Sequence, residues 1–339
     1  MAGQRADPAR VDRHAGRERP LHRRDPARTA DAGARVALAT ARPTLLIDAS
    51  SLAYRAYHAM PPVHAPDGTL VNAVVGFLNF VARLLVDRRP AHLVVAMEFG
   101  SDWRPQFRVA LLPEYKSHRV ATADTPPDEV EPQLIMIAEV LRALGISIAN
   151  AEECEAEDVI ATLTTRFPGP IEIVSGDRDL YALVKDPRIT VLYTLRGVSE
   201  LAHVDQAWIR EKYGIPGDRY LDYAVLRGDP SDGLPGVRGI GEKSASELLR
   251  KYGSLDGILA AKDLSASMRA KLNAGKDYIA AARKVVGAVM DCGVGEVDGT
   301  IPRAPTDRIV ELAERYGIAA STKRVVDALA ARASVPSDR

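Results

Sequence analysis

Short, β-rich apolar runs alternate with amphipathic segments between Pro43 and residue 204. The runs predict strands over 44–47, 93–97, 146–149, 171–175 and 190–194, and the amphipathic segments predict helices over 71–86, 129–143 and 155–167. The first of these helices carries apolar side chains at spacings of three and four, which gives it one buried side: Val74, Val75, Leu78, Val81 and Leu85. This alternation predicts an α/β fold whose mostly parallel sheet is covered on both faces.

The remaining chain divides into three regions. Residues 1–42 alternate arginine with proline, alanine and aspartate, without apolar periodicity, and are expected to be a disordered tail. This tail is interpreted as a weak nucleic-acid tether, a solvated tail or sequence upstream of a misplaced start codon, and the last two interpretations are favoured. After the α/β domain over 43–204, a helical domain is expected over 205–295, and closing helices with a frayed end over 296–339.

The composition indicates a globular protein without a membrane span. A chain of 339 residues that is 46% hydrophobic has enough apolar material for two folded domains, and we expect it to be a soluble cytoplasmic monomer. The formal net charge is +0, so any surface for an anionic partner must be local. Apolar runs of about 18 residues, which a membrane span needs, are missing from the sequence. Cys154 and Cys292 are too few for a disulfide framework or a cysteine zinc site, and we infer a reducing compartment.

Acidic residues follow three of the expected strands. Asp48 ends the first strand, Glu98 follows the second, and Asp177 and Asp179 follow the strand over 171–175. In open α/β sheets, ligands bind beyond the carboxyl ends of the strands. The sheet would therefore bring these side chains together.

A helix expected over 155–167 begins with further acids. Glu155 and Asp158 are three residues apart and share a face, and Glu157 lies beside them. Taken alone, such acids are often only favourable partners of the helix dipole. If they meet the acids of the strand ends, mutual repulsion raises their pKa values, and hard divalent cations are the usual way to hold them ionised. The pattern therefore favours a metal centre.

Four segments, taken in order, resemble the bacterial 5′→3′ exonuclease and flap endonuclease family, which includes the N-terminal nuclease domain of DNA polymerase I. They are DASSLAYR at 48–55, EAED at 155–158, SGDRDL at 175–180 and RGDPSDGLPGVRGIG at 227–241. The resemblance extends from about Pro43 to about Met290. It implies a PIN-like, Rossmann-like sheet with a helical arch at about 100–130, followed by a helix-three-turn-helix, a form of the helix-hairpin-helix.

The resemblance also implies a set of metal ligands. These are Asp48, Glu98, Glu155, Glu157, Asp158, Asp177, Asp179, Asp229 and Asp232. Two places depart from the family pattern: Glu157 stands where aspartate is common, and the ligand after the second strand is Glu98 when counted from His92 but Asp102 when counted back from Trp103. We favour Glu98. Asp229 and Asp232 lie in a turn-like segment that their side chains could merely cap.

Basic and aromatic residues are interleaved over 104–119. An exposed loop with an ordinary charged face is one interpretation of this segment. The resemblance instead assigns Lys116 and Arg119 to the scissile phosphate as catalytic cations. Tyr115 is then available for base stacking, a contact that tolerates any sequence, and Arg108 is a further phosphate contact.

Glycines punctuate the segment 234–243, where Gly236, Gly239 and Gly241 permit a tight hairpin between helices. The N–H groups of Gly239 and Gly241 would lie at a helix N-terminus, where phosphate is favoured, and Arg238 and Lys243 add charge. The resemblance implies a hairpin that holds duplex DNA by its backbone, often with a bound K⁺. A plain packing motif between two helices is the alternative.

The function that this resemblance implies is a stand-alone, metal-dependent 5′→3′ exonuclease and 5′-flap endonuclease. It would use two Mg²⁺ or Mn²⁺ ions on nicked or branched DNA and on RNA–DNA hybrids, in RNA-primer removal and DNA repair. Two alternatives remain open. One is a PIN-like ribonuclease, which would need neither the arch nor the hairpin. The other is a catalytically weakened protein that binds DNA junctions.

Overall fold

A computed structural model describes residues 41–98, 104–119 and 128–333. Contacts divide the chain after Ala37, and all described residues belong to the second unit, Leu38–Arg339. Almost all of the tail predicted over 1–42 lies outside the described residues. Asp102 and much of the predicted arch lie outside them too.

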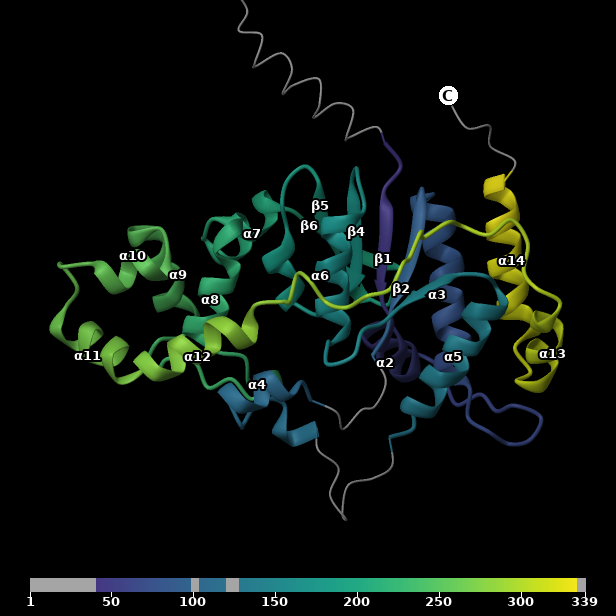
Figure 1. Cartoon of the computed structure of the whole chain (residues 1–339), viewed down its shortest axis with the longest axis horizontal. Helices are drawn as coiled ribbons and strands as arrows, with labels where there is room; N and C mark the ends of the chain where they lie inside the picture. The colour runs from purple at the N-terminus through teal and green to yellow at the C-terminus, as the bar shows by residue number, and fades with distance from the viewer. Residues whose placement is uncertain (1–40, 99–103, 120–127, 334–339) are drawn as a thin grey trace, which may run out of the picture. The chain divides into compact units, whose positions relative to one another are not determined.

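The centre of the fold is a six-stranded sheet with the order β3-β2-β1-β4-β5-β6 (Figure 1). All neighbours pair in parallel except β5 and β6, so the predicted, mostly parallel sheet is confirmed. The strands are β1 (Thr44–Asp48), β2 (His92–Ala96), β3 (Ser147–Ala149), β4 (Ile171–Ser175), β5 (Ile189–Arg196) and β6 (Glu200–Val204). The strand β6 was not predicted, because it lies at the edge of the sheet and only Val204 in it is fully buried.

Alternate residues of β1 face two different hydrophobic cores. Leu45 and Ile47 belong to the core formed with α2 (Ala49–Ala59), α3 (Asn72–Arg88) and α5 (Glu131–Ala143). Leu46 belongs to the core formed with α6 (Ala156–Arg166) on the other face. A strand that is buried on both faces is what a parallel sheet with helices on each side requires.

The predicted C-terminal helices are confirmed as α13 (Arg308–Arg315) and α14 (Ala319–Ala333). They join the first core through Ile309, Leu312, Val325 and Leu329. In Figure 1, α14 runs beside α3, which it contacts closely. These helices therefore cover the face of the sheet opposite α6.

A helical region follows the sheet and shares the core on the α6 side. Leu249 and Ile279 belong to the same buried cluster as Ile173 of β4. The helices are α7 (Gln206–Tyr213), α8 (Tyr220–Arg227), α9 (Glu242–Tyr252), α10 (Leu255–Ala260), α11 (Ala266–Ala274) and α12 (Lys276–Val286). The short α4 (Gln106–Leu111) contacts α12. Single 3₁₀ turns are η1 (Ser117–Arg119), η2 (Asp179–Leu183), η3 (Gly217–Arg219) and η4 (Pro230–Asp232). The domain boundary at 204/205 stays a prediction.

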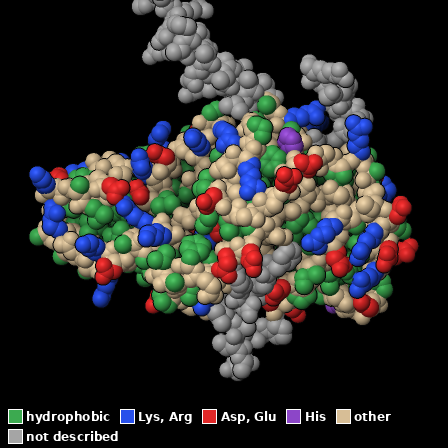
Figure 2. All heavy atoms as spheres, viewed as in Figure 1, with side chains coloured by type: hydrophobic (Ala, Val, Ile, Leu, Met, Phe, Trp, Pro, Cys, Tyr) green, Lys and Arg blue, Asp and Glu red, His purple; other side chains and the backbone are tan. Residues whose placement is uncertain are grey.

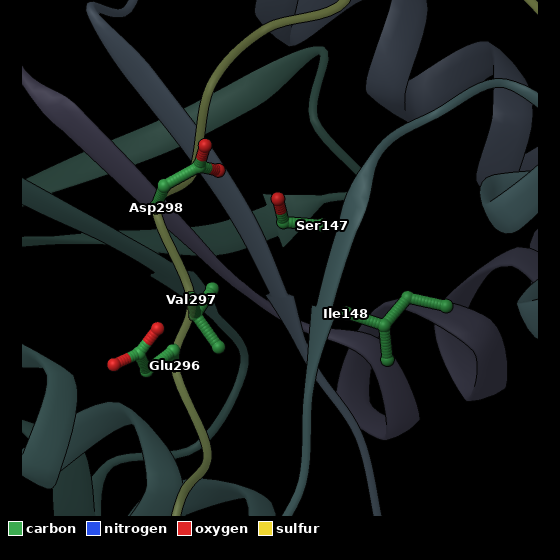
Figure 3. A pocket seen from close by; sticks show the side chains of 5 residues that line it. All are labelled: Ser147, Ile148, Glu296, Val297 and Asp298. Carbon is green, nitrogen blue, oxygen red and sulfur yellow. The ribbon is translucent and has the colours of Figure 1, made fainter.

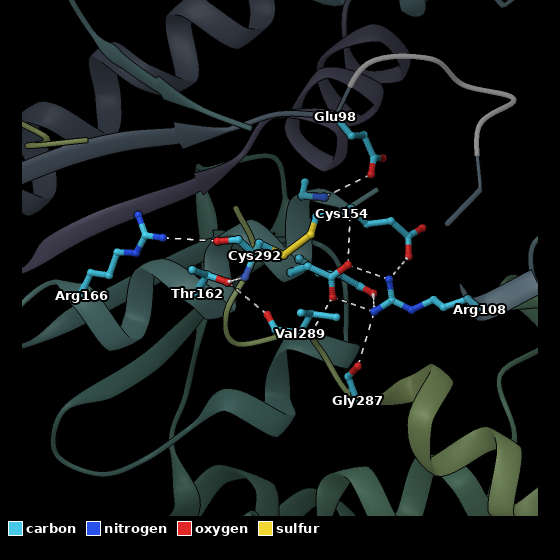
Figure 4. Close-up of a disulfide and its surroundings, with 12 residues drawn as sticks. Glu98, Arg108, Cys154, Thr162, Arg166, Gly287, Val289 and Cys292 are labelled. Atoms are coloured by element: carbon cyan, nitrogen blue, oxygen red, sulfur yellow. Dashed lines mark hydrogen bonds and ion pairs between the residues drawn. A yellow bond between two sulfur atoms is a disulfide. The ribbon is translucent and has the colours of Figure 1, made fainter. Parts of the chain in front are cut away.

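A disulfide joins Cys154, just before α6, to Cys292, which follows α12 (Figure 4). A single disulfide is consistent with the earlier conclusion that two cysteines are too few for a framework of several disulfides. Disulfides are rare in a reducing cytosol, and the compartment that we inferred from the cysteine count stays a prediction. Within the described ranges, the helices are all too short or too polar to cross a membrane.

Candidate active site

Asp48 lies at the carboxyl end of β1 and begins α2 as its N-cap. One carboxylate oxygen accepts from the Ser51 N–H at 3.1 Å, and the other accepts from the Ser175 hydroxyl at 2.6 Å. Burial raises the pKa of Asp48 to about 7, against the lowering effect of these hydrogen bonds, and the charges of Asp177 and Glu98 raise it further. The ends of β1, β2 and β4 thus hold three acids close together, as the strand-end rule predicted.

Glu157, Asp177 and Asp179 form the centre of the acidic cluster. One carboxylate oxygen from each residue lies within 4.8 Å of the others, a spacing that fits a common metal ion. Burial raises the pKa of Glu157 and of Asp179, and repulsion from Asp177 adds to both shifts. Glu98 accepts a hydrogen bond from the Ala156 N–H at 3.2 Å, so it points toward the start of the helix that carries Glu157.

Asp229 and Asp232 approach the cluster from η4. Both raise the pKa of Asp179 by repulsion, after burial and Asp177. The turn-capping interpretation holds for Asp229, which accepts from the Ser231 N–H at 2.9 Å and pairs with Arg227 at 3.0 Å. A capping carboxylate can still offer an oxygen to a metal, so the two interpretations are compatible.

The position of Arg108 was not predicted from the sequence. Its side chain is fully buried between α4 and α6 and donates to Asp158 at 2.6 and 2.7 Å and to Glu155 at 2.8 Å (Figure 4). It also donates to the backbone carbonyl of Val285 at 3.0 Å. We therefore correct the predicted phosphate contact: Arg108 is the internal counter-ion of the acidic helix start.

Glu155 and Asp158 form a reciprocal capping box at the start of α6. Each oxygen of Asp158 accepts two hydrogen bonds. Oδ1 accepts from Arg108 and the Val289 N–H, and Oδ2 accepts from Arg108 and the Glu155 N–H. Asp158 is therefore saturated, and we reassign it from metal ligand to positioning residue. These bonds fit the helix-end interpretation for this residue.

Tyr115 and Lys116 also lie inside the site. The Tyr115 side chain is buried, and its hydroxyl donates to Glu155 at 2.7 Å, so the structure contradicts the predicted role of an exposed stacking platform. The Lys116 ammonium lies 2.6 Å from Glu155 and 3.8 Å from Asp232. It therefore lies between the α6 acids and the η4 acids. The Arg119 side chain is outside the described residues.

A strap over 287–295 ties the end of the helical region to α6. The Val289 N–H donates to Asp158 at 2.8 Å, the Cys292 N–H donates to Thr162 at 3.0 Å, and Arg166 donates to the Val294 carbonyl at 2.7 Å. The disulfide from Cys292 lies among these contacts (Figure 4). The strap thus holds the helix that carries Glu157 by hydrogen bonds and by a covalent bond.

The hairpin glycines have three different surroundings. A Cβ on Gly236 would lie 2.2 Å from the Arg227 carbonyl oxygen, so packing within the protein requires glycine here, and its DNA contact stays a prediction. A Cβ on Gly239 would meet the Lys271 side chain at 3.0 Å, whereas one on Gly241 would meet nothing within 4 Å. Gly241 is the N-cap of α9, and Arg238 and Lys243 are exposed beside it. On the face seen in Figure 2, several Lys and Arg side chains lie over the α9–α11 end.

A hollow lined by Ser147, Ile148, Glu296, Val297 and Asp298 lies along the edge strand β3 (Figure 3). The acidic cluster contributes none of its lining residues. We assign it no part in the chemistry.

Two family models together match most of the chain. Residues 43–214 match the 5′-3′ exonuclease, N-terminal resolvase-like domain, and residues 215–306 match the 5′-3′ exonuclease, C-terminal SAM fold. A 5′-3′ exonuclease of Streptomyces coelicolor is 48% identical over 303 residues, which cover 85% of this chain and 100% of the relative. A 5′-3′ exonuclease of Mycobacterium tuberculosis is 43% identical over 312 residues, which cover 85% and 98%.

Solved structures share the fold at low sequence identity. The 5′-exonuclease of bacteriophage T5, solved with bound divalent metal ions, has a TM-score of 0.59 and 17% identity over 85% of this chain and 100% of that one. The catalytic core of Rad2 in complex with a DNA substrate has a TM-score of 0.51 and 18% identity over 86% and 93%. With both domains matched in order, the chain belongs to the 5′-3′ exonuclease family.

Proposed function

We propose that the protein hydrolyses phosphodiester bonds at the 5′ ends and 5′ flaps of nicked or branched DNA, with two Mg²⁺ or Mn²⁺ ions. The observation that carries this proposal is the meeting of Glu157, Asp177 and Asp179 within 4.8 Å at the carboxyl edge of the sheet. The full-length relatives named 5′-3′ exonuclease support it. We place this activity in the bacterial cytoplasm, in a monomer that removes RNA primers and repairs DNA, with RNA–DNA hybrids among its substrates.

The acidic residues suit hard divalent cations. Their donor atoms are all carboxylate oxygens, the ligands that Mg²⁺ and Mn²⁺ prefer. Burial and repulsion raise the pKa of Asp48, Glu157 and Asp179, and a bound divalent cation would remove this cost of ionisation. The ligands that we propose are Asp48, Glu98, Glu155, Glu157, Asp177, Asp179, Asp229 and Asp232. When bound, such ions neutralise charge at a phosphate and lower the pKa of water.

Two buried basic side chains, Lys116 and Arg108, have different roles in this site. Lys116 lies between the two groups of acids, where its ammonium would donate to a phosphate oxygen and stabilise charge that develops in the transition state. Arg108 pairs with Asp158 and Glu155 and lies 3.7 Å from a carboxylate oxygen of Glu157. It therefore acts through these carboxylates, by holding Glu157 in place. Arg119 stays a proposed partner of Lys116 at the scissile phosphate.

The hairpin supplies the duplex contact in this proposal. Gly241 is the exposed N-cap of α9, where a phosphate is favoured, and the exposed Arg238 and Lys243 flank it. Contacts of this kind bind the phosphate backbone and position the duplex without reading its sequence.

A cleavage assay tests the proposed reaction. A labelled 5′-flap duplex and a single-stranded RNA would each be incubated with the protein, with and without Mg²⁺, beside the Asp177→Asn variant. We expect the flap alone to be cut, only with Mg²⁺, and only by the wild type. Preferential cutting of RNA would favour the PIN-like ribonuclease, and flap binding without cutting would favour a junction-binding protein.

Gly241→Ala tests the hairpin with little risk to folding. The residue has φ −97° and its added Cβ would meet nothing in the protein within 4 Å. A loss of duplex affinity at unchanged thermal stability would therefore report a backbone that approaches this glycine. Unchanged affinity would place the duplex elsewhere.

A further inference from the structure

Lys271 of α11 reaches into the hairpin from outside it. Its ammonium donates a hydrogen bond of 3.0 Å to the carbonyl oxygen of Gly239, 32 residues away in the chain. The aliphatic part of the side chain crosses the same glycine, because a Cβ built on Gly239 would lie 3.0 Å from Lys271 Cε. The Lys271 side chain thus places a positive charge directly against the hairpin backbone.

Packing fixes where this lysine can lie. Its neighbour Leu272 is buried in the same core as Val237 and Ile240 of the hairpin. Gly275, which ends α11, lies against Val237, since its Cβ would be 3.2 Å from Val237 Cγ1. The end of α11 that follows Lys271 is therefore anchored to the hairpin. The backbone of Lys271 is thus fixed beside the hairpin, and its ammonium is within reach of the Gly239 carbonyl oxygen.

The resemblance implied a K⁺ ion at this hairpin, and the residues present do not fit it at Gly239. K⁺ is bound in proteins by oxygens such as backbone carbonyls. The Gly239 carbonyl already accepts from a positive group, and a second cation at the same oxygen would be repelled. Lys271 therefore competes with the ion for this ligand.

We propose that the Lys271 ammonium takes the place of a monovalent cation at the hairpin and binds the phosphate of duplex DNA. An ammonium has three N–H donors, and the Gly239 carbonyl uses one of them. The others are available to a phosphate oxygen that approaches the start of α9. Duplex binding then depends on Lys271 and not on the choice of K⁺ or Na⁺. This inference rests on the proposed duplex contact of the hairpin.

The test compares duplex affinity in K⁺ and in Na⁺ at equal ionic strength. Fluorescence anisotropy of a labelled blunt duplex would be measured in EDTA for the full chain, Lys271→Met, Lys271→Arg and Lys262→Met. Lys262 is an exposed lysine shortly before α11, and Lys262→Met is the control that removes one positive charge away from the Gly239 carbonyl. Thermal unfolding of each variant checks that it is folded.

We expect the wild type to bind equally in the two salts, within about twofold, and Lys271→Met to bind about tenfold more weakly in Na⁺. K⁺ should restore part of this loss, Lys271→Arg should keep most of the affinity, and Lys262→Met should lose little in either salt. Wild-type binding that requires K⁺, or equal behaviour of Lys271→Met and Lys262→Met, would overturn the inference and leave the proposed nuclease standing. A wild type that binds no duplex would overturn the hairpin contact itself.

Discussion

Arg108 and Asp158 form a two-pronged ion pair in which neither side chain is exposed, with N–O distances of 2.6 and 2.7 Å. The pair joins α4, which lies within the predicted arch segment, to the first turn of α6, which carries Glu157. It therefore couples the region that would receive DNA to the helix that would hold metal. A buried pair of this kind is costly to break, because the remaining partner is left as an uncompensated charge.

Asp158→Asn should destabilise the fold by about 3–5 kcal/mol, since it leaves Arg108 buried without its main partner. Arg83→Met is the matched control, because Arg83 forms an exposed pair with Asp87 and should cost less than about 1 kcal/mol. Urea unfolding in EDTA would measure both free energies. A cost for Asp158→Asn no larger than the control's would remove the positioning role that we assign to this pair.

Asp177→Asn should abolish cleavage while leaving stability and duplex binding nearly unchanged. The Asp177 Oδ1 accepts from the Asp179 N–H at 2.9 Å, and an asparagine oxygen can keep that hydrogen bond while it loses the charge that a metal needs. Single-turnover cleavage and anisotropy on the same flap duplex would separate the two effects. Turnover near that of the wild type would contradict the metal assignment.

Comparing two variants identifies the metal ligand that follows β2. Glu98 lies close enough to Asp48 to raise its pKa and accepts from the start of α6, so Glu98→Gln should cost far more activity than Asp102→Asn. Cleavage rates over a range of Mg²⁺ concentrations would show whether the loss is one of metal affinity. The reverse ranking would transfer the ligand to Asp102, and two small effects would mean that neither residue binds metal.

Without metal, stability should fall as pH rises through neutrality. The pKa of Asp48 is raised from 3.8 to about 7 in the folded protein, so the folded state binds the proton more tightly than the unfolded state. This stabilisation is complete below about pH 4 and is lost as pH passes about 7. Between pH 5.5 and 8, the wild type in EDTA should lose about 2 kcal/mol more than Asp48→Asn. Unfolding curves at both pH values test this, and Mg²⁺ should reduce the wild-type loss at pH 8.

Rules based on periodicity and strand ends predicted the sheet and its acidic edge. Asp48, Glu98 and Asp177 follow buried parallel strands, so their convergence needs no knowledge of long-range contacts. Arg108 was beyond such rules. It lies 50 residues from Asp158 in the chain, in a basic and aromatic segment whose composition is typical of an exposed loop. Only tertiary packing decides that its guanidinium enters the protein.

The same limit applies to the cysteines and to the hairpin. Cys154 and Cys292 are 138 residues apart, and a count of two predicts nothing about their separation in space. One signal was present in the sequence: Cys154 directly precedes the acidic helix start, where a constraint would have the greatest effect on the site. Lys271 gave no signal, because its role depends on how α11 packs against a hairpin that is distant in the chain.

Reduction of the Cys154–Cys292 bond should lower stability without loosening the site. Closing a loop of this length restricts the unfolded chain, which in the chain-entropy account stabilises the fold by about 2–5 kcal/mol. The hydrogen bonds from Val289 and Arg166 would still hold the strap on α6. Cys292→Ala and the reduced wild type should therefore unfold at equally reduced urea concentrations yet cleave a flap at the wild-type rate. A Cys292→Ala variant as stable as the oxidised protein would show that the bond does not contribute, and a matching loss of cleavage would show that the covalent link itself positions Glu157.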